Sequence, residues 1–233
     1  MVVLTLVAVA VGALGAGASA GDDTAPAGPP TVTPAPLLDD RPNIVVVLTD
    51  DQRADTLDYM PAVQRLLVER GTRYTQAMVP TSLCCPSRAT ILTGRYAHTT
   101  RVFGNGDVGG ARYGGWARFF RTGAEQRTMA VRLQAAGYRT AMFGKYLNYF
   151  GRYSQRLVGP GYVPPGWDEF AVLMSSHGSY VNYRLSDGTS YGEAPEDYST
   201  DVFRREAVAT IRSTTDGRIT TPSFAIVAAT IAI

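Results

Sequence analysis

Short apolar runs alternate along this chain with amphipathic stretches, and the alternation predicts an α/β fold. Residues 44–49 (IVVVLT) are continuously apolar and mostly β-branched, as in a strand buried on both faces of a parallel sheet. Residues 60–71 form a predicted amphipathic helix that ends at a glycine, with one apolar face made by Met60, Val63, Leu66 and Leu67.

The same alternation continues to the end of the chain. Apolar runs predict further strands at 72–79, within 138–148 and at 224–228, and helical spacing predicts helices at 86–95, 128–137 and 199–213. Strands that alternate with helices in this way indicate a mostly parallel sheet sandwiched by helices.

The first 41 residues differ in character from the remainder. Residues 1–20 are apolar and end in a small-x-small triplet, which indicates a secretion signal; a buried helix or a membrane anchor is the alternative. Residues 21–41 are a Pro-rich linker by composition, and residues 42–233 are the folded domain. We therefore expect a protein that is secreted or on the exterior of the cell envelope, without a stable membrane span.

Charge narrows the range of partners. The formal net charge is +2 and no run of Lys or Arg occurs, which argues against a nucleic-acid surface. Apolar residues make up 45% of the chain, enough for a core of the kind that enzymes and binding domains have.

The two cysteines of the chain are adjacent, at positions 84 and 85. Neighbouring Cα atoms lie about 3.8 Å apart, which is too close for an ordinary disulfide. With no further Cys or nearby His they also make a poor zinc site. Pro86 and Gly94 then predict a short helix that begins just after Cys84. Cys84 would lie at a helix N-terminus, which favours anions, with Arg88 one turn further as an oxyanion ligand; two inert buried thiols are the alternative.

A pair of acids ends the first predicted strand. Asp50 and Asp51 fall at its carboxyl end, where open α/β sheets bind their ligands. Adjacent carboxylates suit Ca²⁺ or, less well, Mg²⁺, although Asp is also common at helix N-caps.

The stretch CCPSRATILTGR, residues 84–95, resembles the signature of the sulfatase family, C-x-P-S-R followed by L-T-G-R. The doubled cysteine is most similar to the N-acetylglucosamine-6-sulfatase and extracellular endosulfatase branch. The resemblance implies an alkaline phosphatase-like sulfatase fold and calcium at Asp50 and Asp51. It also implies conversion of Cys84, by a formylglycine-generating enzyme, to the catalytic formylglycine, which also binds the metal.

Further roles follow from the same resemblance. Arg88 would hold the formylglycine, and Lys145, in FGKYLN, would bind the sulfate. Many family members have a histidine where this chain has Leu147, so that role is not carried over, and Asn148 is a partial substitute. His98 is a candidate at the rim of the site, with a structural role as its alternative.

The implied activity is hydrolysis of a sulfate ester, on a sulfated carbohydrate such as N-acetylglucosamine 6-sulfate or on an aryl sulfate. Because the last predicted strand lies close to residue 233, we expect a C-terminally truncated, incomplete catalytic domain. A non-catalytic secreted fragment and a related phosphate-ester hydrolase are the alternatives.

Overall fold

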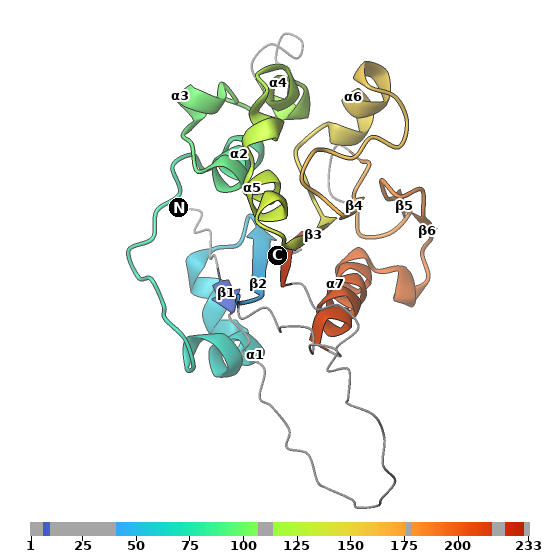
Figure 1. Ribbon diagram of the computed structural model, residues 1–233. Helices are drawn as coiled ribbons and strands as arrows, with labels where there is room; N and C mark the ends of the chain where they lie inside the picture. Colours follow the sequence, from blue (N-terminus) through green and yellow to red (C-terminus); the bar gives the residue numbers. More distant parts are fainter. Residues whose placement is uncertain (1–6, 10–40, 107–113, 176–178, 216–221, 231–233) are drawn as a thin grey trace, which may run out of the picture.

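The computed structural model describes residues 7–9, 41–106, 114–175, 179–215 and 222–230 (Figure 1). The predicted secretion signal and linker therefore lie outside the described residues, except for residues 7–9 and Arg41. No helix in the described ranges combines the length and apolar character that a membrane crossing requires.

A five-stranded sheet forms the centre of the molecule, in the order β1-β2-β7-β3-β4 (Figure 1). Strands β2 (Ile44–Asp50), β7 (Ser223–Thr230), β3 (Arg139–Gly144) and β4 (Glu169–Val172) run parallel. The edge strand β1 (Val7–Val9) pairs antiparallel with β2. The mostly parallel sheet predicted from the sequence is confirmed.

Alternating side chains along the strands build two separate cores, one on each face of the sheet. On one face, Val46, Leu48, Met142 and Ile226 belong to a cluster with residues of four helices, α2 (Cys84–Thr93), α4 (Gly115–Arg121), α5 (Met129–Ala135) and α6 (Phe150–Leu157). On the other face, Ala141, Phe143 and Ala225 pack against Val202, Phe203 and Ala207 of α7 (Ser199–Thr215). Helices thus cover both faces, as the sequence predicted.

The helices have these bounds: α1 Pro61–Val63, α2 Cys84–Thr93, α3 Ala97–Thr100, α4 Gly115–Arg121, α5 Met129–Ala135, α6 Phe150–Leu157 and α7 Ser199–Thr215. Helical turns of other types occur at η1 Ala54–Tyr59, η2 Gln64–Val68, η3 Ala124–Arg127 and η4 Pro195–Asp197. A separate two-stranded sheet pairs β5 (Tyr183–Arg184) with β6 (Ser190–Tyr191).

Two predicted elements were wrong or incomplete. Residues 72–79 form no strand: the side chains there are mostly exposed, Tyr74 by 76% and Met78 by 91%, so burial does not favour an extended pairing. The helix predicted at 60–71 is only one turn of α-helix followed by a π-helical turn, and none of the predicted apolar face is buried.

Candidate active site

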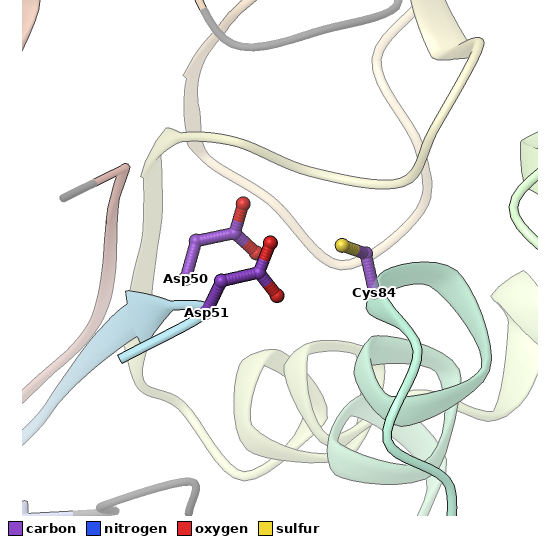
Figure 2. Close-up of side chains that lie close together, drawn as sticks. All are labelled: Asp50, Asp51 and Cys84. Atoms are coloured by element: carbon purple, nitrogen blue, oxygen red, sulfur yellow. The ribbon is translucent and has the colours of Figure 1, made fainter. Parts of the chain in front are cut away.

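The acid pair lies at the carboxyl end of β2. Asp50 is the last residue of the strand and is buried, whereas Asp51 is exposed. Asp51 has φ of 56°, in the left-handed region that is unusual for a residue with a side chain. This backbone turn brings the second carboxylate alongside the first, and Figure 2 shows both facing the sulfur of Cys84.

The helix α2 supplies the opposite wall of the site. It begins at Cys84 itself, after an extended Leu83, and ends at Gly94, which has φ of 66°. The predicted helix was confirmed, but it begins two residues earlier than Pro86, because Leu83 accepts the first intrahelical bond from Ser87 N–H at 3.0 Å. Cys84 is therefore the first residue of the helix.

Arg88 and Lys145 bring two cations to the same place. Arg88 Nη2 lies 2.9 Å from Asp50 Oδ1, and Lys145 Nζ bonds Asp50 Oδ2. Lys145 Nζ also lies 3.4 Å from Cys84 Sγ. Arg88 also contacts the backbone of the loop that carries Lys145, because its Nη1 donates to the Lys145 carbonyl at 2.5 Å. β2, α2 and the loop after β3 thus meet at one point.

Asp50 is the electrostatic centre of this arrangement. Burial of the carboxylate raises its pKa, but the charge of Arg88 and the hydrogen bonds and charge of Lys145 lower it, and the net pKa is below the ordinary value. Asp50 is therefore ionised at neutral pH, with two nearly buried cations as its partners.

The residues present fit a divalent cation. Ligand atoms of Asp50, Asp51 and Cys84 all lie within 4.8 Å of one another. The two carboxylates are the hard donors that Ca²⁺ and Mg²⁺ prefer, whereas a thiol is a soft donor. Conversion of Cys84 to formylglycine would replace the sulfur with oxygen, so that all three positions would offer oxygen.

An open pocket of about 400 Å³, with the solvent at its mouth included, adjoins the cluster. Asp50, Asp51, Cys84 and Arg88 line it together with the segment from Val79 to Leu83. Sequence reasoning missed the hydroxyls of Thr81, Ser82 and Ser87 on this wall. Ser87 lies within the C-x-P-S-R motif and could have been noted there; the other two lie in an irregular segment that carries no motif.

Cys85 faces away from this chemistry. Its side chain is completely buried, and burial raises the pKa of the thiol to about 12. The backbone N–H groups of Asn148 and Gly115 lie against its sulfur, which joins α2 to two neighbouring segments. The structure thus separates the two adjacent cysteines, with Cys84 at the pocket and Cys85 in the core.

Two further predicted residues do not line the pocket. Asn148 is buried, and its backbone carbonyl accepts from Trp116 N–H at 2.9 Å. His98 is exposed on α3 and stacks on Tyr96, with ring centroids 5.9 Å apart. It follows the C-terminal end of α2, a helix about 15 Å long whose other end holds Cys84.

Known proteins resemble this chain in sequence and in fold. The profile of a family described as Sulfatase matches residues 42–232. An N-acetylglucosamine-6-sulfatase of Capra hircus is 38% identical over 165 residues, which are 69% of this chain and 28% of that protein. An extracellular sulfatase SULF-1 homolog of Drosophila melanogaster is 36% identical over 182 residues, 74% of this chain and 15% of that protein.

A solved structure shares the fold. It is a protein in complex with its substrate D-glucosamine-2-N,6-O-disulfate, aligned with a TM-score of 0.56 at 25% identity over 81% of this chain and 34% of the other. The chain spans only 15% and 28% of the length of the two curated relatives named above.

Proposed function

This chain belongs to the sulfatase family, and from that premise we propose that it carries the nucleophile and the first metal ligands of a sulfuric ester hydrolase. One observation supports this above all others: Cys84 meets Asp50, Asp51 and Arg88 at a single open pocket, and Lys145 contacts Asp50 and Cys84 there, although the sequence separates these residues widely. Ordinary packing gives no reason to gather a thiol, two acids and two cations there.

Each side chain has a role that its position supports. Formylglycine at position 84, once a formylglycine-generating enzyme has produced it, adds water to form a gem-diol. One hydroxyl loses its proton and attacks the sulfate sulfur, and the ester S–O bond breaks as the alcohol takes up a proton and leaves. The second hydroxyl then loses its proton, the C–O bond to the sulfate group breaks, and sulfate departs as the aldehyde re-forms, so hydrolysis is divided into two steps. Lys145 would bind a sulfate oxygen, and its distance of 3.4 Å from Cys84 Sγ supports this role. Arg88 holds Asp50 and the loop carrying Lys145, so the positive charge is fixed before substrate arrives.

A divalent cation, Ca²⁺ rather than Mg²⁺, would be held by Asp50, Asp51 and residue 84. Such an ion polarises the sulfate oxygens when bound. The carboxylate pair provides the charge to hold it, and Asp51 projects from a left-handed turn that presents its oxygens beside those of Asp50.

The proposed substrates are sulfate esters of sugars, such as N-acetylglucosamine 6-sulfate. The names of the relatives support this class, as does the glucosamine disulfate bound in the structural neighbour. Aryl sulfates are suitable test substrates because the chemistry acts on the same ester group. We also propose a location outside the cytoplasm, supported by the extracellular relative and by the apolar residues 1–20.

The decisive test compares the adjacent cysteines as a matched pair. Cys84→Ala should reduce hydrolysis of an aryl sulfate by about a thousandfold or more, since the nucleophile is lost. Cys85→Ala should keep most of the activity and lower stability by only about 1–2 kcal/mol through lost packing. Mass spectrometry of the peptide that contains both residues should find formylglycine at 84 and an unmodified cysteine at 85.

Parallel assays separate the alternatives. Turnover of an aryl phosphate in preference to the aryl sulfate would favour a phosphate-ester hydrolase. A folded chain that contains formylglycine but turns over neither ester would favour a non-catalytic role. Equal loss of activity in the two cysteine variants would contradict the assignment of Cys84.

A further inference from the structure

Asn105 lies outside the motifs described above, yet its side chain reaches the helix that carries Cys84. Its Oδ1 accepts a hydrogen bond from the Cys85 backbone N–H at 2.7 Å, across 20 positions of sequence. The first N–H groups of a helix have no partner within the helix, and a polar side chain at the cap position usually accepts from one of them. In α2 that position holds Leu83, which makes no such bond. A distant loop residue thus takes the place of the missing local cap.

Close glycine contacts fix the backbone on both sides of Asn105. Gly104 pairs with Gly114 in an isolated bridge, and its carbonyl accepts from Gly115 N–H at 2.9 Å. A Cβ added to Gly106 would lie 2.1 Å from the ring of Tyr149. The position of the accepting oxygen is therefore set by the surrounding fold.

A second anchor holds the same helix one turn later, where Arg88 donates to the Lys145 carbonyl. Cys84 precedes both anchors, and its turn of the helix is held by the Asn105 bond to Cys85 N–H together with the Ser87 N–H bond to the Leu83 carbonyl. Without the Asn105 bond, the Cys85 N–H loses its partner, and the first turn of α2 should fray more readily, as uncapped helix ends do.

We propose that Asn105 is a positioning residue for the nucleophile: by holding Cys85 N–H it fixes the first turn of α2 and the direction in which residue 84 faces Asp50 and Lys145. Its catalytic consequence rests on the proposed function, whereas its anchoring of the helix does not.

The first measurement needs no turnover. In the chain that has not been converted to formylglycine, Cys85 is completely buried whereas Cys84 lines the pocket, so iodoacetamide at neutral pH should label Cys84 and spare Cys85. In Asn105→Ala, fraying should increase the rate of Cys85 labelling, followed by peptide mass spectrometry, by about tenfold or more. Thr128→Ala is the matched control, because Thr128 caps α5 by accepting from Val131 N–H at 3.3 Å. It should leave Cys85 protected.

The second measurement uses the formylglycine-containing chain with an aryl sulfate. Asn105→Ala should lower kcat about tenfold or more with KM changed less than about twofold, since the sulfate-binding cation remains. Asn105→Asp keeps an oxygen acceptor and should restore both protection and kcat to near the wild-type values. If Asn105→Ala does not fold, Asn105→Gln displaces the oxygen by one methylene and should give the same losses.

Equal Cys85 labelling in the Asn105→Ala (or Gln) and Thr128→Ala variants would overturn the anchoring, and an unchanged kcat in a frayed variant would overturn the positioning. If the wild-type chain hydrolyses no sulfate ester, the proposed function fails, while the labelling comparison still decides whether Asn105 holds the helix.

Discussion

Asp50 and Asp51 are neighbours in sequence but have opposite environments. Asp50 is buried between Arg88 and Lys145, which satisfy both of its oxygens, whereas Asp51 is exposed in a left-handed turn. A buried charge with charged partners is costly to remove, because the partners remain buried and uncompensated. The two acids should therefore differ sharply in what they contribute to stability.

Exchanging each acid for its amide tests this difference. Asp50→Asn keeps the shape but removes the charge between two cations, so urea unfolding with a chelator present should show a loss of about 3 kcal/mol. Asp51→Asn is the control, since Asn tolerates the left-handed backbone. It should change stability by less than about 0.5 kcal/mol. Similar losses of stability in the two variants would show that Arg88 and Lys145 do not require the Asp50 carboxylate in particular.

Glu125 is a second buried acid, and it lies outside the pocket. Burial raises its pKa, and hydrogen bonds from Tyr162 (2.8 Å) and Trp116 (2.5 Å) only partly oppose this. Because the folded pKa lies above the unfolded value, its stabilising contribution is complete below about pH 4.3 and is lost as pH rises through the folded pKa.

Glu125→Gln should remove the loss of stability with rising pH, because residue 125 then no longer titrates. Between about pH 4 and pH 7 the wild-type free energy of unfolding should fall relative to that of the variant, by about 1.4 kcal/mol per unit of pKa difference. Tyr162→Phe removes a donor to the ionised form and should make the fall steeper. Parallel pH curves for wild type and Glu125→Gln, measured by urea unfolding, would contradict the assignment.

At the residue scale, sequence and resemblance together named five residues that the structure brings together. Asp50, Asp51, Cys84, Arg88 and Lys145 meet as expected. His98 was predicted at the rim of the site from its proximity in sequence, and Asn148 from the family resemblance; the length of α2 separates His98 from Cys84, and Asn148 is buried. Asn105 could not be found because its contact spans 20 positions and involves no motif.

Elements were predictable where burial dictated a pattern. Strand β2 and helix α7 have long, regular patterns and were predicted nearly to their ends. The helices α4 and α6 and the strand β4, of seven, eight and four residues, were missed. The strand predicted at 72–79 was wrong: its residue types favour a strand, but most of the side chains are exposed, so burial does not favour their pairing in a sheet.

Helix α6 offers a prediction at this scale. A Cβ added to Gly151 would lie 2.1 Å from the Met174 carbonyl, so the helix packs directly on backbone. Ala normally favours a helix interior over Gly by about 1 kcal/mol, but here the clash should reverse the sign and cost about 1–3 kcal/mol. Gln155→Ala, at an exposed position of the same helix, should be nearly neutral by urea unfolding. A stabilised Gly151→Ala would show that the helix can shift away.

Over the whole molecule, the order of the sheet explains how distant segments assemble the site. Strand β7, late in the sequence, lies between β2 and β3 and sets the spacing between Asp50 and the loop with Lys145. Parallel strands end at the same edge, so both side chains emerge there, and α2 closes the third side from the face with α4 and α5. Periodicity predicts strands and helices, but it does not give this order.

At the scale of the whole chain, the number of ligands that the proposed cation site offers determines how tightly it binds calcium, and calcium titration measures this affinity. Among the described residues the cluster offers three ligand positions, whereas Ca²⁺ takes 6 to 8, so the remaining positions fall to water or to groups outside this cluster. We expect weak binding, with half-saturation at about 10⁻⁴–10⁻³ M, and a rise in Tm that grows with calcium concentration. Mg²⁺, which retains its waters more strongly, should give a smaller rise.

Asp51→Asn separates metal binding from folding. Because Asp51 makes little contribution to the metal-free fold, this variant should keep the wild-type Tm in chelator but lose most of the calcium-dependent rise, since one charged ligand is gone. Asp50→Asn should lower the Tm in chelator and also lose the rise. A full calcium response in Asp51→Asn would place the bound ion elsewhere in the protein, and Asp50 would then serve only its ion pairs with Arg88 and Lys145.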